Sequence, residues 1–92
     1  MSINFEWDED KAQENLKKHG IGFDEAISVF NDSLSLTIPD IKHSVGEERF
    51  IDIGLSNRNR LIIVVYTERN NVIRLISSRL ATKKEKKSYE SI

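Results

Sequence analysis

The sequence contains no cysteine, one proline and only two histidines, and each scarcity excludes a class of protein. Without cysteine there is no disulfide framework and no thiolate metal site, which suits a reducing cytoplasm. A zinc site would need both His19 and His43 together with carboxylates, so we expect no metal and no other cofactor. No apolar run approaches the roughly 20 residues of a membrane-spanning helix, and the acidic start MSINFEWDED is unlike a signal peptide. These absences predict a cytoplasmic protein with no membrane association.

The 92 residues are enough for one domain, 1–92, with a single core of two packed layers. Charge is unevenly distributed along this chain. Residues 1–48 hold four Lys or Arg against eleven Asp or Glu, whereas residues 49–92 hold ten against four. The opposite halves could simply attract each other within one fold. The alternative is a basic face that binds phosphates.

The first third of the chain predicts a short strand and two helices. Residues 3–7 alternate apolar and polar side chains, as an edge strand does. Asp8 can cap a helix over 9–18, with acidic residues in its first turn, lysines in its last turn and Gly20 as its C-terminal stop. Residues 23–30 place apolar side chains at helical spacing, which predicts a second helix.

Four strands and a final helix are expected in the remainder. Residues 34–38 alternate until Pro39 ends the strand, and a loop over 39–48 follows. Three strands in meander order come next, joined by turns at NRN and RNN: 49–56, 60–68 and 72–79. Thr82 and Glu85 then form a capping box for a terminal helix. The order β-α-α-β-β-β-β-α predicts an α+β fold, an antiparallel sheet with the helices packed on one face.

The register of the meander decides which side chains share a face. A turn that pairs Ser56 with Arg60 would place Ile53 opposite Ile63 and Phe50 opposite Tyr66. One face would then be uniformly apolar and should lie under the helices: Ile51, Ile53, Leu55, Leu61, Ile63 and Val65. The other face includes a carboxylate and a phenol and is the predicted cleft: Phe50, Asp52, Gly54, Ile62, Val64 and Tyr66.

The turn after the central strand decides which arginine joins Tyr66. If that turn preserves parity, Arg74 shares the face of Tyr66, and if it shifts the register by one residue, Arg79 does. A β-bulge could bring both arginines to the face of Tyr66. The sequence leaves these three arrangements open.

These residue types suit cleavage of RNA without a metal. In that reaction the ribose 2′-hydroxyl attacks the neighbouring phosphorus, a base takes its proton, a cation stabilises the developing charge and an acid protonates the leaving 5′-oxygen. Arginine suits the cation role because it stays charged and its fork matches phosphate oxygens. Tyr66 could donate a hydrogen bond or stack on a base, although a tyrosine here is more often a core aromatic. The competent bases and acids are Glu48, Glu68, His19 and His43.

Several stretches together resemble the BrnT toxins of type II toxin–antitoxin systems, from Phe5 to Glu90. They are FEWDEDKAQENLKKHGIGFDEAISVF, DSLSLTIPD, HSVGEERFIDIG and RLIIVVYTERNNVIRLISSRLATKKEKKSYE. The combination of KHG, HSxGEER and ISxRxAT carries the resemblance. It implies a RelE-like fold and an RNA-cleaving, translation-blocking toxin that needs no metal. It also implies a BrnA-like antitoxin, whose ribbon-helix-helix part binds DNA and represses the shared operon, so that DNA is reached only through the antitoxin.

The resemblance also implies site residues, carried over by position and without assigned roles: Lys18, His19, His43, Glu47, Glu48, Arg49, Glu68, Arg74, Arg79 and Thr82. Together with the chemistry above, this gives an expected catalytic set of Glu48, Arg49, Tyr66, Glu68, Arg74 and Arg79. The expected RNA-binding set is Lys18, His19, His43, Lys83 and Lys84.

An alternative function follows from Leu80, which stands where many relatives carry a second arginine. A missing phosphate-binding cation would favour a non-catalytic or degenerate binding module. Such a module would hold an antitoxin and act in autoregulation of the operon without cutting RNA.

Overall fold

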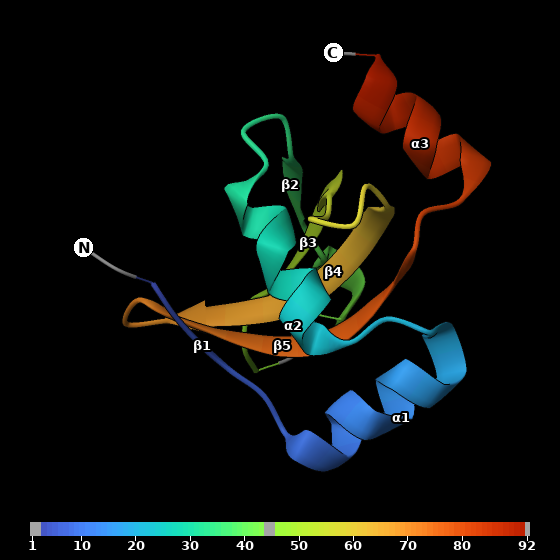
Figure 1. The fold of residues 1–92 in the computed structure, drawn as a ribbon. Coiled ribbons are helices and arrows are strands. Elements are labelled where there is room, and N and C mark those ends of the chain that lie inside the picture. The colour runs from blue at the N-terminus through green and yellow to red at the C-terminus, as the bar shows by residue number, and fades with distance from the viewer. Residues whose placement is uncertain (1–2, 44–45, 92) are drawn as a thin grey trace.

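A computed structural model describes residues 3–43 and 46–91 and shows a five-stranded mixed sheet with helices (Figure 1). Its elements in chain order are β1 (Asn4–Glu6), α1 (Glu9–His19), α2 (Phe23–Ala26), the 3₁₀ helix η1 (Ile27–Asn31), β2 (Leu36–Pro39), the 3₁₀ helix η2 (Ile41–His43), β3 (Arg49–Leu55), β4 (Leu61–Arg69), β5 (Val72–Leu80) and α3 (Lys83–Glu90). Ser44 and Val45, which belong to the loop predicted over 39–48, lie outside the described residues. No helix among the described residues is long and apolar enough to cross a membrane.

The strands follow the order β1-β5-β4-β3-β2, with β4 in the middle. A central position explains why β4 is apolar at both odd and even positions. The four strands β2 to β5 are antiparallel, but β1 pairs with β5 in parallel. The prediction of a wholly antiparallel sheet is therefore wrong at β1. No turn fixes the direction of this strand, because α1 and most of the chain separate it from its partner.

Local signals place the ends of α1, α3 and the hairpin turns as predicted. Asp8 Oδ1 accepts hydrogen bonds from the backbone N–H groups of Asp10 and Lys11, at 2.9 and 3.3 Å. Gly20 ends α1 with a φ of 71°, a conformation that suits a residue without a Cβ. The capping box of Thr82 and Glu85 is present at α3.

The two hairpins have turns in which asparagine takes up positive φ. Asn70 and Asn71 have φ values of 52° and 66° and form the two-residue turn between β4 and β5, the geometry that suits the strand twist. In the preceding turn the Ser56 N–H donates to the Arg60 carbonyl at 2.8 Å. The predicted register of β3 on β4 is therefore confirmed, with Ile53 opposite Ile63.

The helix predicted over 23–30 is shorter than expected. Regular α-helix ends at Ala26, and the tighter η1 continues the chain. The Ser28 hydroxyl donates to the Glu25 carbonyl at 2.6 Å. A hydroxyl that competes for backbone groups, together with the β-branched residues Ile27 and Val29, favours departure from regular α-helix.

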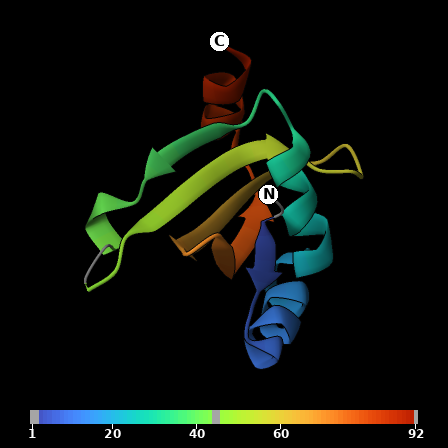
Figure 2. The same cartoon turned by 90° about the vertical axis from the view of Figure 1, so that its left-hand side faces the viewer.

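The core lies on the face of the sheet that carries Tyr66. Helices α1, α2 and η1 gather on one side of the sheet, whereas α3 stands apart beyond the strand ends (Figure 2). The buried apolar cluster joins α2, η1 and the turn after α1 to two strands, β4 and β5: Ile21, Phe23, Ala26, Val29, Ile62, Val64, Tyr66, Ile73 and Leu75. The prediction that this face forms the open cleft is wrong, as is the prediction that the uniformly apolar face lies under the helices.

Two residues on the face under the helices, which we call the covered face, explain why the two faces are the reverse of the prediction. Gly54 lets η1 approach closely, since a Cβ at this position would lie 2.6 Å from Val29 Cγ1. Asp52 is only 2% exposed, but its Oδ1 accepts hydrogen bonds from the hydroxyls of Tyr66 and Thr37. Polar side chains that bind each other can be buried, so their presence did not mark a cleft.

Two buried clusters of polar side chains connect the helices to the sheet by hydrogen bonds. The Asn15 amide of α1 donates to Ser78 of β5, and the Ser78 N–H donates back to Asn15 Oδ1 at 3.0 Å. The Glu25 carboxylate of α2 accepts from the Arg60 guanidinium and from Ser56 Oγ at the β3–β4 turn. The hydrogen bond from Arg60 holds the pKa of Glu25 below its usual value. These contacts fix which face of the sheet the helices cover.

Candidate nucleic-acid interface

The face of the sheet away from α1, α2 and η1 carries four arginines beside aliphatic side chains. Residues paired across an antiparallel ladder share a face, so the register defines this surface. We call it the open face. On β2 to β5 it consists of Leu36, Ile38, Arg49, Ile51, Ile53, Leu55, Leu61, Ile63, Val65, Thr67, Arg69, Val72, Arg74, Ser77 and Arg79, and Asn4 and Glu6 of β1 pair beside Val72 and Arg74. None of these residues belongs to the buried cluster described above. Ile53 and Ile63 at its centre are buried, whereas the side chains of Arg74 and Arg79 are 50% and 42% exposed.

A β-bulge in β5 brings Arg74 and Arg79 to the same face. Val65 pairs with Ser77 but the next residue, Tyr66, pairs with Leu75, so Ile76 is the extra residue. Positions 74 and 79 are an odd number of residues apart, and a regular strand would place them on opposite faces. A bulge is present, but none of the three arrangements that the sequence left open occurs, since each would have placed an arginine beside Tyr66. The bulge places both arginines opposite to Tyr66 rather than beside it.

Arg49 joins them from β3. Arg49 pairs with Thr67 of β4, and Thr67 pairs with Arg74 of β5. Two strand spacings therefore separate Arg49 and Arg74, about 10 Å. Arg79 lies further along β5, roughly 15 Å from Arg74 at the usual rise per residue. The three guanidinium groups thus span a surface that a phosphate backbone could follow.

Two of these arginines already bind carboxylates within the chain. Arg74 donates to Glu6 of β1 at 2.6 Å, and both groups are half exposed. Arg79 makes two hydrogen bonds of 2.8 Å to Glu85 of α3. The hydrogen bonds from Arg79 lower the pKa of Glu85 to about 2. A phosphate that binds either arginine must compete with its carboxylate.

A cavity of about 480 Å³ lies where β3 begins, β4 ends and β5 begins. It brings together four of the predicted site residues, Glu47, Glu48, Glu68 and Arg74. Arg69 and Glu6 also line it and were not predicted. An arginine beside a turn gives no signal of its own, and Glu6 reaches this place only because β1 pairs with β5. The cavity therefore holds carboxylates beside guanidinium groups, the groups that proton transfer and phosphate binding need.

Other predicted residues lie elsewhere. Lys18 and His19, at the end of α1, line a separate cavity of about 250 Å³ that includes Ser77 of the open face. His43 Nδ1 lies 3.0 Å from an Asp40 carboxylate oxygen on the surface. Lys83 and Lys84 are exposed in the first turn of α3. The structure does not gather these residues into one site.

Tyr66 is a core residue. It is 6% exposed and its ring contacts those of Phe30 and Phe50. Its hydroxyl donates to Asp52 Oδ1 at 3.1 Å, and burial raises its pKa above the ordinary value. A phenol held in this way under η1 cannot stack on an RNA base, so Tyr66 is left out of the site proposed below.

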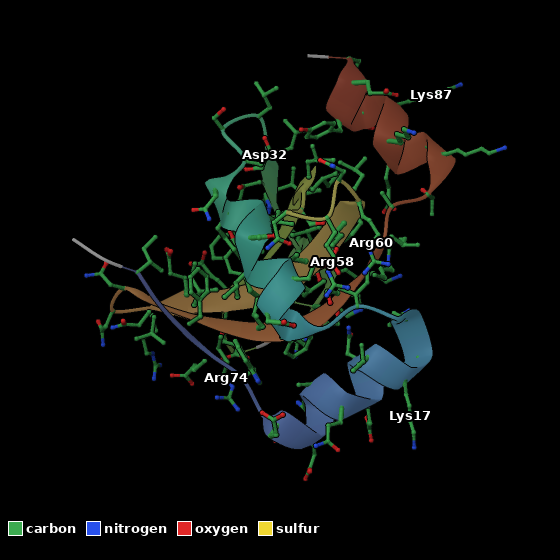
Figure 3. All side chains as sticks on the ribbon, viewed as in Figure 1. Lys17, Asp32, Arg58, Arg60, Arg74 and Lys87 are labelled. Carbon is green, nitrogen blue, oxygen red and sulfur yellow. The ribbon has the colours of Figure 1, made fainter. Side chains whose placement is uncertain are left out.

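Leu80 lies on the opposite face to Arg79. It pairs with Ile62 of the covered face, near the end of β5, and is 50% exposed. An arginine in its place would therefore not add a cation to the open face. Arg74 projects beside β1, away from Arg58 and Arg60 and at the other end of the molecule from Lys87 (Figure 3).

Comparisons with known proteins show the family of this chain and a similar fold. The profile of a family described as the ribonuclease toxin, BrnT, of type II toxin–antitoxin systems matches residues 7–85, a range that contains the four arginines of the open face. Among solved structures, the chain is similar to the 1.1 Å crystal structure of the Brucella abortus ribonuclease toxin BrnT. The two share 25% sequence identity with a TM-score of 0.69, over 89% of this chain and 100% of that chain. No curated protein matches the sequence significantly.

Proposed function

Because the chain belongs to the BrnT family, the ribonuclease toxins of type II toxin–antitoxin systems, we propose that it is a metal-independent endoribonuclease that binds RNA through the arginines of its open face. The observation that carries this proposal is the alignment of Arg49, Arg74 and Arg79 on one exposed side of the sheet. Cations at several points along a surface suit the regularly spaced phosphates of a nucleic acid better than one small anion. Lys18, Lys83 and Lys84 would add positive charge at the margins.

The reaction that these side chains suit is attack by the ribose 2′-oxygen. A bond forms between that oxygen and phosphorus while the bond from phosphorus to the 5′-oxygen breaks. A base accepts the 2′-hydroxyl proton, and an acid gives a proton to the leaving 5′-oxygen. Arg74 would stabilise the negative charge on phosphorus, with Glu48 and Glu68 of the same cavity as the groups that exchange protons.

The biological setting follows from the family. A type II toxin is paired with an antitoxin, and we propose a BrnA-like protein whose ribbon-helix-helix part binds DNA. The toxin would then reach DNA only through this partner. Cleavage of RNA would block translation, which places the toxin in the cytoplasm. A RelE-like fold belongs to the same proposal.

The degenerate binding module is the weaker alternative. Its motivating feature was Leu80 in place of an arginine, and Leu80 lies on the face opposite to Arg79. The loss of an arginine there leaves the cations of the open face unchanged. We therefore retain ribonuclease activity as the conclusion for this chain.

The direct test is incubation of purified protein, free of antitoxin, with RNA in the presence of EDTA. We expect cleavage that leaves a 2′,3′-cyclic phosphate, since the 2′-oxygen is the nucleophile. An Arg79→Ala variant purified in parallel controls for contaminating nucleases. RNA that stays intact with the well-folded wild-type protein would overturn the proposal, and cleavage that appears only when Mg²⁺ is added would overturn the metal-independent mechanism.

A further inference from the structure

The open face has a second part that the arginines do not explain. Beside them lies a surface of aliphatic side chains from β2, β3 and β4. We call it the apolar patch, and it consists of Leu36, Ile38, Ile51, Leu55 and Val65. Ile38 is 48% exposed and Leu55 is 41% exposed, while the other three are partly buried. Adjacent large aliphatic side chains left in water on a soluble protein commonly mark a binding surface.

RNA is a poor occupant for this patch. Proteins hold single-stranded RNA through cations, through rings on which bases stack and through polar groups that read base edges. The apolar patch offers none of these, because all five of its side chains are aliphatic. Its place on the sheet suits a protein chain instead. β2 is the outermost strand of the sheet at this side, and an outermost strand can pair with an added extended segment.

The charges around the patch restrict the partner further. Arg79 and Arg74 border it on β5, and Arg49 follows it on β3. Four lysines of α3 lie beyond the strand ends: Lys83, Lys84, Lys86 and Lys87. An aliphatic surface framed by cations complements a segment in which aliphatic and acidic side chains alternate.

A second copy of this chain fits less well. Two open faces packed about a twofold axis would bring the arginines of one copy close to those of the other. Like charges at such short range oppose association, and the two carboxylates beside them, Glu6 and Glu85, already bind Arg74 and Arg79 within the same copy. The partner should therefore be a different protein.

We propose that the apolar patch is the docking surface for the antitoxin, through a segment that alternates aliphatic and acidic residues. The inference rests on the proposed function, which supplies the antitoxin as partner and the arginines as RNA ligands. In this proposal the arginines of the open face bind RNA, and the apolar patch binds the antitoxin. Changes in the apolar patch weaken antitoxin binding and spare RNA cleavage.

The test uses the full-length toxin and, as probe, the full-length antitoxin encoded by the adjoining reading frame. Binding is titrated with purified proteins, and RNA cleavage is measured in parallel. We expect Ile38→Ser and Leu55→Ser each to weaken antitoxin binding by about tenfold, as for an anchor at an interface, and to keep cleavage within about twofold of wild type. Both positions are well exposed, so the fold should be retained, which circular dichroism checks.

The matched control is Leu16→Ser, since Leu16 is 54% exposed on α1 and lies outside the open face. Unchanged antitoxin binding by both patch variants would overturn the proposal. So would loss of cleavage together with binding, which would make the patch part of the RNA site. A wild-type dimer that Ile38→Ser dissociates would show a second copy as the occupant. If the wild-type protein failed to cleave RNA, the proposed function would fail while the binding titration still decided this inference.

Discussion

Arg79 and Glu85 are joined by two hydrogen bonds of 2.8 Å, one from each terminal nitrogen of the guanidinium group to each carboxylate oxygen. Glu85 Oε1 also accepts from the Thr82 N–H at 2.8 Å, which closes the capping box of α3. The same carboxylate thus caps the first turn of α3 and occupies the edge of the Arg79 guanidinium group that would bind a phosphate. An RNA phosphate must displace Glu85 to use both of these nitrogens.

Release of Arg79 should strengthen RNA binding. In Glu85→Gln the side chain can still serve the capping box, but it no longer carries a charge that competes with phosphate. We expect RNA affinity to rise about two- to fivefold, in keeping with the modest strength of a partly exposed ion pair. Glu90→Gln, which removes the same charge from the same helix, is the control for fluorescence-anisotropy titrations. An equal gain with Glu90→Gln would mean that overall charge, and not the release of Arg79, is responsible.

The same pair should make the stability of the protein depend on pH in acid. Hydrogen bonds from Arg79 lower the pKa of Glu85 to about 2 from its ordinary value of 4.5. A depressed carboxyl pKa gives stability that is full above pH 4.5 and is lost as the pH falls toward 2. The difference in urea midpoint between wild type and Glu85→Gln should therefore shrink over this range. A difference that stays constant between pH 5 and about pH 2.5 would contradict the assignment.

Asp52 should affect the pH dependence of stability in the opposite sense to Glu85. Burial raises its pKa above the usual value, so ionised Asp52 opposes folding as the pH rises through its folded-state pKa. Asp52→Asn keeps an oxygen that can accept from Tyr66 and Thr37 and removes the buried charge. We expect a free energy of unfolding at pH 7 that is higher than that of wild type, with the gain shrinking toward pH 4. Chemical denaturation at the two pH values checks this, and a gain of equal size at both would contradict it.

Gly54 sets the distance between β3 and η1. In Gly54→Ala the new Cβ would stand 2.6 Å from Val29 Cγ1 and 3.1 Å from Ser35 Cβ. We expect destabilisation of about 1–3 kcal/mol from this overpacking. The double variant Gly54→Ala, Val29→Ala should lose less than the sum of the two single variants, because the second change removes the methyl groups that clash. Strict additivity in urea unfolding would show that the two side chains do not meet.

Much of the fold follows from local signals in the sequence. Asp8 and Gly20 mark the ends of α1, Thr82 marks the start of α3, and the turn from Ser56 to Arg60 sets the register of β3 on β4. Each of these features depends on a few neighbouring residues. The direction of β1 and the side on which the helices pack depend on distant contacts, and β4 is apolar on both faces. The hydrophobic periodicity of β4 therefore could not show which side of the sheet the helices cover.

The candidate site was predictable as a set of residue types but not as an arrangement. The arginines were selected for their chemistry and by the family resemblance. Their common face depends on the bulge at Ile76, which the sequence does not mark, and Tyr66 belongs to the other side. Arg69 was missed because it reaches the cavity only through the pairing of β4 with β5. Tertiary register, rather than composition, decides which side chains meet.

The most direct measurement compares single arginine variants in RNA cleavage with EDTA present and in growth arrest on expression without antitoxin. We predict that Arg49→Ala, Arg74→Ala and Arg79→Ala each lower the cleavage rate at least about tenfold, since each removes a charge-assisted phosphate contact. Arg58→Ala is the matched control, because Arg58 is exposed on the β3–β4 turn, outside the open face (Figure 3). It should remain within about twofold of wild type. Cleavage and growth arrest that persist unimpaired in all three open-face variants would contradict the account.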